Sequence, residues 1–321
     1  MTTTSTILRR VTASSAAVVL ATVTLAACGG DGDDKTADGL TRVTLSIPPV
    51  GDSLPVYQAI SEGYFEDEGL SVELTPAANG ATTINALVSG STDLALVSYP
   101  SLITAYASDL PVTIAAPAIA GTADYQAGLY VLADSSIEEP ADMLGKKFAT
   151  PSLGSVGDIW FRGVLLDEGL DYDDVEFVEL PQANMAAALE AGDVDGIFQT
   201  EPTLSATKAE LDVRAIGFQE GPQGLFATST STLEDDPEVV EGFRAAMARA
   251  VEDLEEDPRA VAVAQMPANT EMSAATAETM GLPAYETEYD AAGVQDVIDL
   301  MAEVGLIEEA FDASDLWRDL G

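Results

Sequence analysis

Hydrophobic and polar positions follow two alternating periods from residue 42 onward. Short apolar runs rich in β-branched residues are typical of strands, and apolar residues spaced three or four apart are typical of helices. Strands are predicted at 42–49, 71–77, 93–98, 111–118, 127–134, 175–181, 194–200 and 213–218, and another begins at Gly224. Helical stretches separate most of these strands, so the pattern predicts an α/β fold.

The chain becomes mainly helical after the strand that begins at Gly224. Helices are predicted at 236–256, from 258 onward, at 293–303 and at 312–320. No long linker interrupts the chain, so we expect these helices to pack back on the first α/β unit. The predicted organisation is a first lobe at 41–133, a second lobe at 134–223, and a return to the first lobe at 224–321.

The first 27 residues differ from everything that follows. They hold Arg9 and Arg10 but no acidic residue, and an apolar run of small residues leads to Leu-Ala-Ala-Cys at 25–28. This run is short for a membrane span and is typical of a signal peptide. Leu-Ala-Ala-Cys resembles the bacterial lipobox, which implies that Cys28 receives a diacylglycerol and, as mature residue 1, a further acyl chain such as palmitate. The alternative is an ordinary signal peptide with an incidental cysteine.

Residues 28–40 are rich in Gly and Asp and predict a flexible acidic tether between the lipid and the folded body. Their Asp spacing resembles a calcium loop superficially, but the glycine at the sixth position and the closing glutamate are missing. We therefore expect no metal site there.

The charge balance excludes several classes of function. The chain has 13 Lys and Arg against 55 Asp and Glu, a net charge of −42, so binding to nucleic acid or to anionic lipid by charge is not expected. It has no histidine and one cysteine, which excludes Ser/His/Asp and Cys/His triads, an intramolecular disulfide and cysteine-based metal clusters. We expect no cofactor and no catalysis.

Five motifs carry a resemblance that spans about residues 42–311. They are GYFEDEGL (63–70), ALVSGSTDLAL (86–96), MLGKKFATP (143–151), NMAAALEAGDVDGIFQTEP (184–202) and VIDLMAEVGLIEEAF (297–311). The motifs are also physically sensible, because Gly63 and Gly69 permit left-handed turns and Asp93 is placed to bond backbone amides. Together they resemble the periplasmic substrate-binding proteins of ABC importers, in the nitrate/sulfonate/taurine branch that includes thiamine-precursor binders.

The resemblance implies a two-lobe type II periplasmic-binding-protein fold, also called a Venus flytrap, in which each lobe has a mostly parallel sheet flanked by helices. It implies a monomer that binds a small molecule between its lobes on the extracytoplasmic side of the membrane. The implied partners are a permease and its cytoplasmic ATPase. A sensor lipoprotein without transport stays open as an alternative. The fold also resembles that of the yeast-type pyrimidine synthase, but the residues of this chain exclude that chemistry. The synthase consumes its own histidine and has a cysteine-rich iron motif, which this chain lacks.

Ligands of open α/β sheets bind beyond the carboxyl ends of strands, near helix N-termini. Four loops fit this placement, near residues 52, 79 to 99, 155 and 201. The candidate ligand contacts in or beside them are Asp52, Ser53, Tyr57, Asn79, Ser98, Tyr99, Gly154, Ser155, Asp158, Trp160 and Glu201. The alternative for Tyr57 and Trp160 is core packing, and for Asp158 it is capping its own helix or pairing with Arg162. Glu201 shows no local partner in the sequence.

The four loops contain carboxylates and no Lys or Arg. A carboxylate facing the ligand would repel nitrate or a sulfonate, so the loops favour an amine-bearing heterocycle or a cation. The alternative is an anion held by helix N-terminal amides and hydroxyls, to which Gly154 and Ser155 would contribute.

The net charge of −42 predicts a salt-dependent stability. Self-repulsion destabilises the folded protein in dilute buffer, and a surface of this kind suits high ionic strength. The melting temperature should rise between about 0.05 and 1 M NaCl, as the Debye length falls from over 10 Å to about 3 Å. A flat or falling curve in a thermal melt would reject this account of the charge.

Overall fold

The computed structural model describes residues 35–77, 80–122 and 124–320. The predicted signal peptide, Cys28, Asn79 and most of the predicted tether lie outside the described residues. Among the helices that are described, none combines the length and hydropathy needed to cross a membrane.

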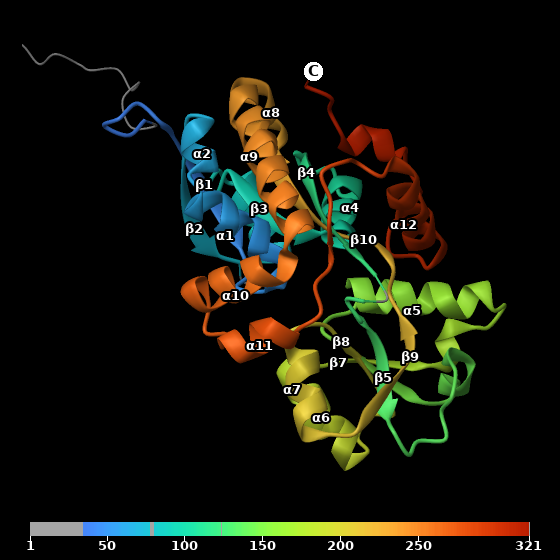
Figure 1. The fold of residues 1–321 in the computed structure, drawn as a ribbon. Helices are drawn as coiled ribbons and strands as arrows, with labels where there is room; N and C mark the ends of the chain where they lie inside the picture. The colour runs from blue at the N-terminus through green and yellow to red at the C-terminus, as the bar shows by residue number, and fades with distance from the viewer. Residues whose placement is uncertain (1–34, 78–79, 123, 321) are drawn as a thin grey trace, which may run out of the picture. The chain divides into compact units, whose positions relative to one another are not determined.

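A six-stranded sheet forms the first lobe, and its strand order is β11-β4-β10-β3-β1-β2 (Figure 1). Strand β1 pairs in parallel with both β2 and β3, whereas β10 pairs antiparallel with both β3 and β4. Helices join the parallel strands, as parallel pairing requires. The strands are β1 (Thr41–Ile47), β2 (Leu70–Pro76), β3 (Leu94–Ser98), β4 (Val112–Gly121), β10 (Gly221–Ser229) and β11 (Ala284–Tyr285).

Helices cover both faces of this sheet because its central strands are apolar on both faces. Along β3, Leu94 and Leu96 enter one hydrophobic cluster, and the alternate residues Ala95 and Val97 enter another. The helices of this lobe are α1 (Leu54–Ser61), α2 (Tyr64–Asp67), α3 (Gly80–Val88), α4 (Tyr99–Ala107), α8 (Thr230–Asp235), α9 (Pro237–Glu256), α10 (Pro258–Asn269), α11 (Ala274–Thr279) and α12 (Ala291–Glu303).

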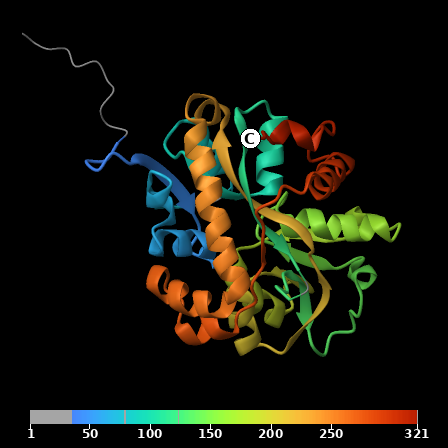
Figure 2. The ribbon, with the colours of Figure 1, turned by 45° about the horizontal axis from the view of Figure 1, so that its top comes forward.

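The late helices pack on the first lobe, as predicted. The long helix α9, orange in Figure 2, packs against α1 and α2, and its Phe243 ring lies 4.9 Å from Phe226 of β10 and 5.7 Å from Phe65. Helix α12 packs against α4 on the other face. Most of the long C-terminal segment therefore completes the core of the first lobe.

A five-stranded sheet forms the second lobe, in the order β7-β6-β8-β5-β9. Strand β6 pairs in parallel with β7 and β8, whereas β5 runs antiparallel to β8 and β9. Both sheets therefore combine parallel strands with antiparallel ones. The elements are β5 (Gly128–Leu132), β6 (Lys147–Thr150), α5 (Val156–Asp167), β7 (Glu176–Glu179), α6 (Gln182–Ala191), β8 (Gly196–Gln199), α7 (Thr203–Glu210) and β9 (Val213–Phe218).

Two crossing segments connect the lobes, from β4 into β5 and from β9 into β10. They run close together, because a Cβ added to Gly121 would lie 2.3 Å from the Gln219 carbonyl oxygen, and one added to Gly128 would lie 2.1 Å from the Gly217 carbonyl oxygen. The predicted boundary at residue 134 is therefore wrong for β5, which already pairs within the second sheet. The apolar pattern of a strand is the same in either sheet, so periodicity does not reveal in which sheet β5 pairs.

The turns singled out in the sequence adopt the expected conformations. Gly63 and Gly69 have φ of +74° and +79°, the left-handed region that glycine adopts without strain. The Asp93 carboxylate accepts a hydrogen bond from the backbone N–H of Thr44 at 2.7 Å, and another from the Thr44 hydroxyl at 2.7 Å. These residues secure the strands of the first lobe and do not reach the site described next.

Candidate functional site

A cavity of about 310 Å³ lies between the loops of the two lobes. It meets loops that follow β1, β2 and β3 of the first lobe and β6 and β8 of the second, which is where open α/β sheets bind ligands. The polar residues that line it are Asp52, Thr83, Ser98, Ser101, Tyr125, Thr200 and Gln223. Apolar lining comes from both lobes, with Leu96 and Ile119 on one side and Val156 and Phe198 on the other.

Asp52 supplies the charge of this cavity. Among its described lining residues, Asp52 is the one charged side chain, and none is Lys or Arg. Tyr125, which is 2% exposed and belongs to a crossing segment, donates its hydroxyl to Asp52 Oδ1 at 3.0 Å. Burial raises the pKa of Asp52 to about 6, although the Tyr125 hydroxyl favours the ionised form. Asp52 is therefore a carboxylate at neutral pH that lacks a cationic partner in the cavity wall.

Hydroxyl groups form another part of the cavity wall. Ser98 begins α4 as its N-cap and accepts a hydrogen bond from the Ser101 N–H at 3.3 Å, and the two hydroxyl oxygens lie 2.8 Å apart. Gly80 approaches so closely that an added Cβ would lie 2.3 Å from Ser101 Oγ. This wall offers donors and acceptors without charge.

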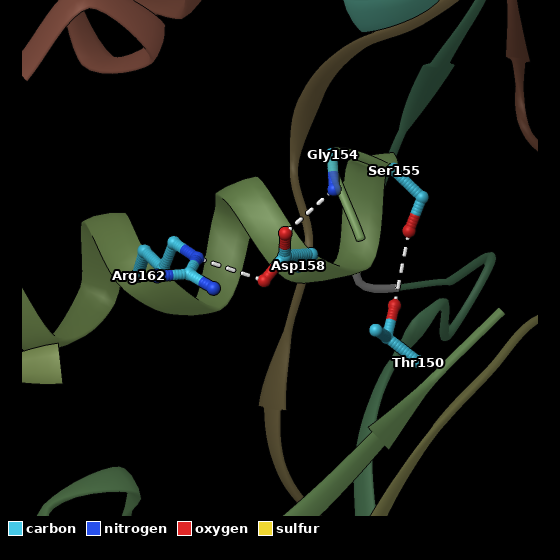
Figure 3. A network of polar contacts seen from close by, with 5 residues as sticks. All are labelled: Thr150, Gly154, Ser155, Asp158 and Arg162. Carbon is cyan, nitrogen blue, oxygen red and sulfur yellow. Dashed lines mark hydrogen bonds and ion pairs between the residues drawn. The ribbon is translucent and has the colours of Figure 1, made fainter. Parts of the chain in front are cut away.

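The start of α5 carries a network of its own (Figure 3). Asp158 is fully buried, and its carboxylate accepts hydrogen bonds from the Gly154 N–H at 2.7 Å and from Arg162 Nε at 2.8 Å. Ser155 Oγ lies 3.0 Å from Thr150 Oγ1 and makes no side-chain cap on the helix. Asp158 therefore serves its own helix, the alternative that the sequence left open, and does not line the cavity.

Glu201 is not without local partners, and that prediction is wrong. Its carboxylate accepts from the Ser205 N–H at 3.1 Å, the Ser205 hydroxyl at 3.0 Å and the Gly281 N–H at 3.3 Å. The partner four residues later is a local one that the sequence allowed, whereas Gly281 is 80 residues away along the chain. Glu201 is 8% exposed and is not among the lining residues of the cavity.

The predicted aromatic contacts lie within hydrophobic clusters. Tyr57 is 4% exposed in the cluster of the first lobe, and Tyr99 is 1% exposed in the cluster on the other face of the sheet. Trp160 packs on the cluster of the second lobe, with its ring 6.1 Å from Phe198. None of these three is among the lining residues of the cavity. Core packing, the alternative stated for Tyr57 and Trp160, describes their positions.

The other predicted residues divide into three groups. Ser98 lines the cavity beside Asp52, and Gly154 and Ser155 line an adjoining groove that shares Gly80, Ser98 and Ser101 with the cavity. Ser53 is fully buried and donates its hydroxyl to the Pro48 carbonyl oxygen at 2.6 Å. Asn79 lies outside the described residues.

Tyr125, Phe198 and Gln223 are among the lining residues that were not predicted. Tyr125 and Gln223 belong to the crossing segments, which contribute to the cavity only because two distant parts of the chain meet there. Phe198 lies within a strand that reads as core. The one signal for Tyr125 was its place in TADYQAG, a polar stretch between two strands.

Comparison with known proteins identifies the family. The model described as NMT1/THI5 like matches residues 51–261. The chain belongs to the NMT1/THI5-like family. Within the described residues, no group of three or more acidic or cysteine side chains is arranged to hold a metal ion.

Curated relatives of this NMT1/THI5-like chain include two binding proteins and one enzyme. The formylaminopyrimidine-binding protein of Halalkalibacterium halodurans is 25% identical over 250 residues, which cover 75% of this chain and 74% of the relative. The taurine-binding periplasmic protein of Escherichia coli is 25% identical over 63% of each chain. The 4-amino-5-hydroxymethyl-2-methylpyrimidine phosphate synthase of Aspergillus parasiticus is 27% identical over 64% of each chain.

Solved structures show the same fold as this family member. The periplasmic aliphatic sulphonate binding protein of Escherichia coli aligns with a TM-score of 0.72 at 20% identity, over 86% of this chain and 96% of that one. The alkanesulfonate-binding protein of Xanthomonas axonopodis pv. citri aligns equally well, at 0.72 and 20% identity, over 87% and 98%. The chain therefore has the two-lobe periplasmic-binding-protein fold.

The raised pKa of Asp52 predicts a pH-dependent difference in stability. The folded state holds the Asp52 proton more tightly than the unfolded state, so this contribution is complete below about pH 4 and is lost as pH rises to about 6. Between pH 4 and 7, the free energy of unfolding of Asp52→Asn should gain about 2 kcal/mol relative to wild type. Urea unfolding across this range measures the gain. The control Asp193→Asn replaces an exposed carboxylate that does not line the cavity. A gain for Asp52→Asn no larger than the gain for this control would contradict the assignment.

Proposed function

We propose that this protein is the extracytoplasmic solute-binding lipoprotein of an ABC importer. Its cavity binds a small amine-bearing heterocycle or an organic cation and presents it to a membrane permease. The family, the fold and two curated relatives that are named as binding proteins support the class of function. The ligand class rests on a single observation, which is that Asp52 is the one charged side chain among the described residues of the cavity wall.

The cavity suits a planar ligand of about one ring. Its volume of about 310 Å³ is at the lower end of the roughly 300–1,000 Å³ typical of small-molecule sites. An amino group beside Asp52 forms a charge-assisted hydrogen bond, and the hydroxyls of Ser98 and Ser101 bond another polar edge of the ligand. The ring then lies against Leu96, Ile119 and Phe198. A ligand held in this way contacts both lobes, so it shifts the population toward the closed form that docks on the permease.

The start of α5 favours a second candidate, an anion binder. Val156 lines the cavity in the first turn of this 12-residue helix, and Ser155 does not cap it. The Asp158 carboxylate in that turn is paired with Arg162, so it would repel an anion less than its sequence suggests. A sulfonate or nitrate is therefore the competing ligand, held by helix N-terminal amides. Asp52 opposes it, and the sign of an Asp52 substitution separates the two.

An enzyme function has less support, although one curated relative is a synthase. The chain contains no histidine and a single cysteine, so it lacks residues of the kind that the resemblance assigns to the synthase reaction. A ligand-presenting sensor remains the other alternative. Genes for a permease and an ATPase beside this one would favour transport over sensing.

Replacement of Asp52 tests the ligand class. For single-ring probes such as 4-aminopyridine and 4-aminopyrimidine, Asp52→Asn should weaken binding by about 1.5–3 kcal/mol, because it removes a charge-assisted hydrogen bond. Calorimetric titration measures the change, with nitrate and methanesulfonate as the anionic probes. Asp124→Asn, a neighbouring exposed carboxylate outside the cavity, is the control with the same change of charge. Tighter methanesulfonate binding by Asp52→Asn, with no amine binding by wild type, would establish the anion binder instead.

Replacement of Cys28 tests the lipid anchor, which rests on Leu-Ala-Ala-Cys at 25–28. Without the thiol no diacylglycerol can be attached, so Cys28→Ala should release the protein into the medium or leave it with an uncleaved leader. Membrane fractionation with mass analysis of the N-terminus distinguishes these products. Normal cleavage with full membrane retention in the variant would argue against the anchor.

A further inference from the structure

Glu201 joins the two lobes at a point away from the crossing segments. It directly precedes α7 of the second lobe, and its Oε1 accepts the Gly281 N–H of the first lobe at 3.3 Å. The Ser205 N–H and hydroxyl donate to the same carboxylate from within α7. This side chain is 8% exposed and three donors hold it, so its direction toward Gly281 is well defined.

Little apolar packing supports this junction. A groove of about 1250 Å³ separates α7 from α10 and α11, and it is lined mainly by alanines and hydroxyl side chains, including Ser205 and Thr279. Figure 1 shows α7 below α11, with the two helices approaching end to side. The hydrogen bond from Gly281 to Glu201 is therefore a polar contact between the lobes beside a groove with little apolar lining.

Gly281 belongs to a segment that we call the strap, residues 280–285, which follows α11 and ends with β11. Arg259 fixes the beginning of the strap, since its guanidinium donates to the carbonyl oxygens of Ala277 at 2.6 Å and Met280 at 2.9 Å. The strap also packs closely against the crossing segment that contains Tyr125. A Cβ added to Gly281 would lie 2.8 Å from the Tyr125 carbonyl oxygen, so only glycine fits without a shift.

The strap holds the loop that carries Asp52. Met280 is fully buried, and its Cε would lie 2.6 Å from a Cβ added to Gly51. Tyr285, at the other end of the strap, donates its hydroxyl to the Gly51 carbonyl oxygen at 3.0 Å. The strap thus contacts the residue before Asp52 at two points, and it contacts Tyr125, the hydrogen-bond partner of Asp52, at a third.

We propose that Glu201 is a positioning residue that latches the second lobe onto the strap and thereby holds Asp52 in its place in the cavity. The part that concerns ligand binding rests on the proposed solute-binding function, whereas the latch itself is a property of the ligand-free protein. Loss of the latch frees α7 from α11 and widens the groove between them.

Distance measurements on the ligand-free protein test the latch. Spin labels at Glu210→Cys in α7 and Glu278→Cys in α11, both exposed, report the width of the groove in the full chain carrying Cys28→Ser. Pulsed double-resonance measurements should give a longer and broader distribution for Glu201→Ala than for wild type. Glu201→Gln should stay close to wild type, because its carboxamide oxygen still accepts the Gly281 N–H. Ser205→Ala, which removes only a partner within the second lobe, is the matched control and should also stay close.

Ligand kinetics give the second readout. Dissociation of 4-aminopyridine should be about tenfold faster from Glu201→Ala than from wild type, with Glu201→Gln restoring most of the difference. An unchanged distance distribution in Glu201→Ala, at an unchanged melting temperature, would overturn the latch. So would an equal widening in Ser205→Ala. If the distance distribution widens in Glu201→Ala but wild type binds no amine, the latch stands and the proposed ligand class fails.

Discussion

The hydrogen bond from the Tyr125 hydroxyl to Asp52 is the contact on which the site depends. It ties a loop of the first lobe to the segment that crosses into the second, at 3.0 Å and with Tyr125 almost fully buried. A carboxylate removed from water is costly unless it is hydrogen-bonded, and the two neutral donors of Asp52, the Tyr125 hydroxyl and its own backbone N–H, satisfy it only in part. The raised pKa of Asp52 follows from this deficit. The cationic ligand that we propose would remove the deficit, so the feature that destabilises the empty cavity would favour its occupied form.

The acidic residues of the chain differ in where their charge acts. The chain carries 55 acidic residues, yet the described wall of the cavity has one. Among the other described acidic residues, Asp158 and Glu201 are buried, and the rest are at least partly exposed to water and salt, which screen them. The charge of Asp52 is exerted inside the cavity, where the dielectric is lower. The surface charge therefore concerns stability in salt, whereas the role that we propose for Asp52 is in the choice of ligand. Stability should depend more strongly on ionic strength than ligand binding at Asp52 does, because buried charges are screened less.

Much of the fold follows from local patterns in the sequence. The period of apolar residues predicted the strands, and Gly63, Gly69 and Asp93 marked turns that depend on their own chemistry. The site was only partly predictable. Asp52 and Ser98 sit at the ends of elements that the sequence shows, whereas Tyr125 and Gln223 reach the cavity because two crossing segments meet there. For Asp158 the sequence left both a ligand contact and a pairing within its own helix open, and the fold decides for the Gly154 N–H and Arg162. Glu201 showed no partner in the sequence, and its Gly281 partner comes from a distant part of the chain.

The protons exchanged on ligand binding test most directly whether Asp52 meets a cation in the cavity. At pH 6 the empty site holds about half a proton on Asp52, and a bound cation stabilises the carboxylate. Titration with 4-aminopyridine, which is already cationic at this pH, in two buffers of different ionisation enthalpy should show release of up to about half a proton per ligand. Asp52→Asn should show none. Proton uptake by wild type, or the same release from both proteins, would contradict the claim.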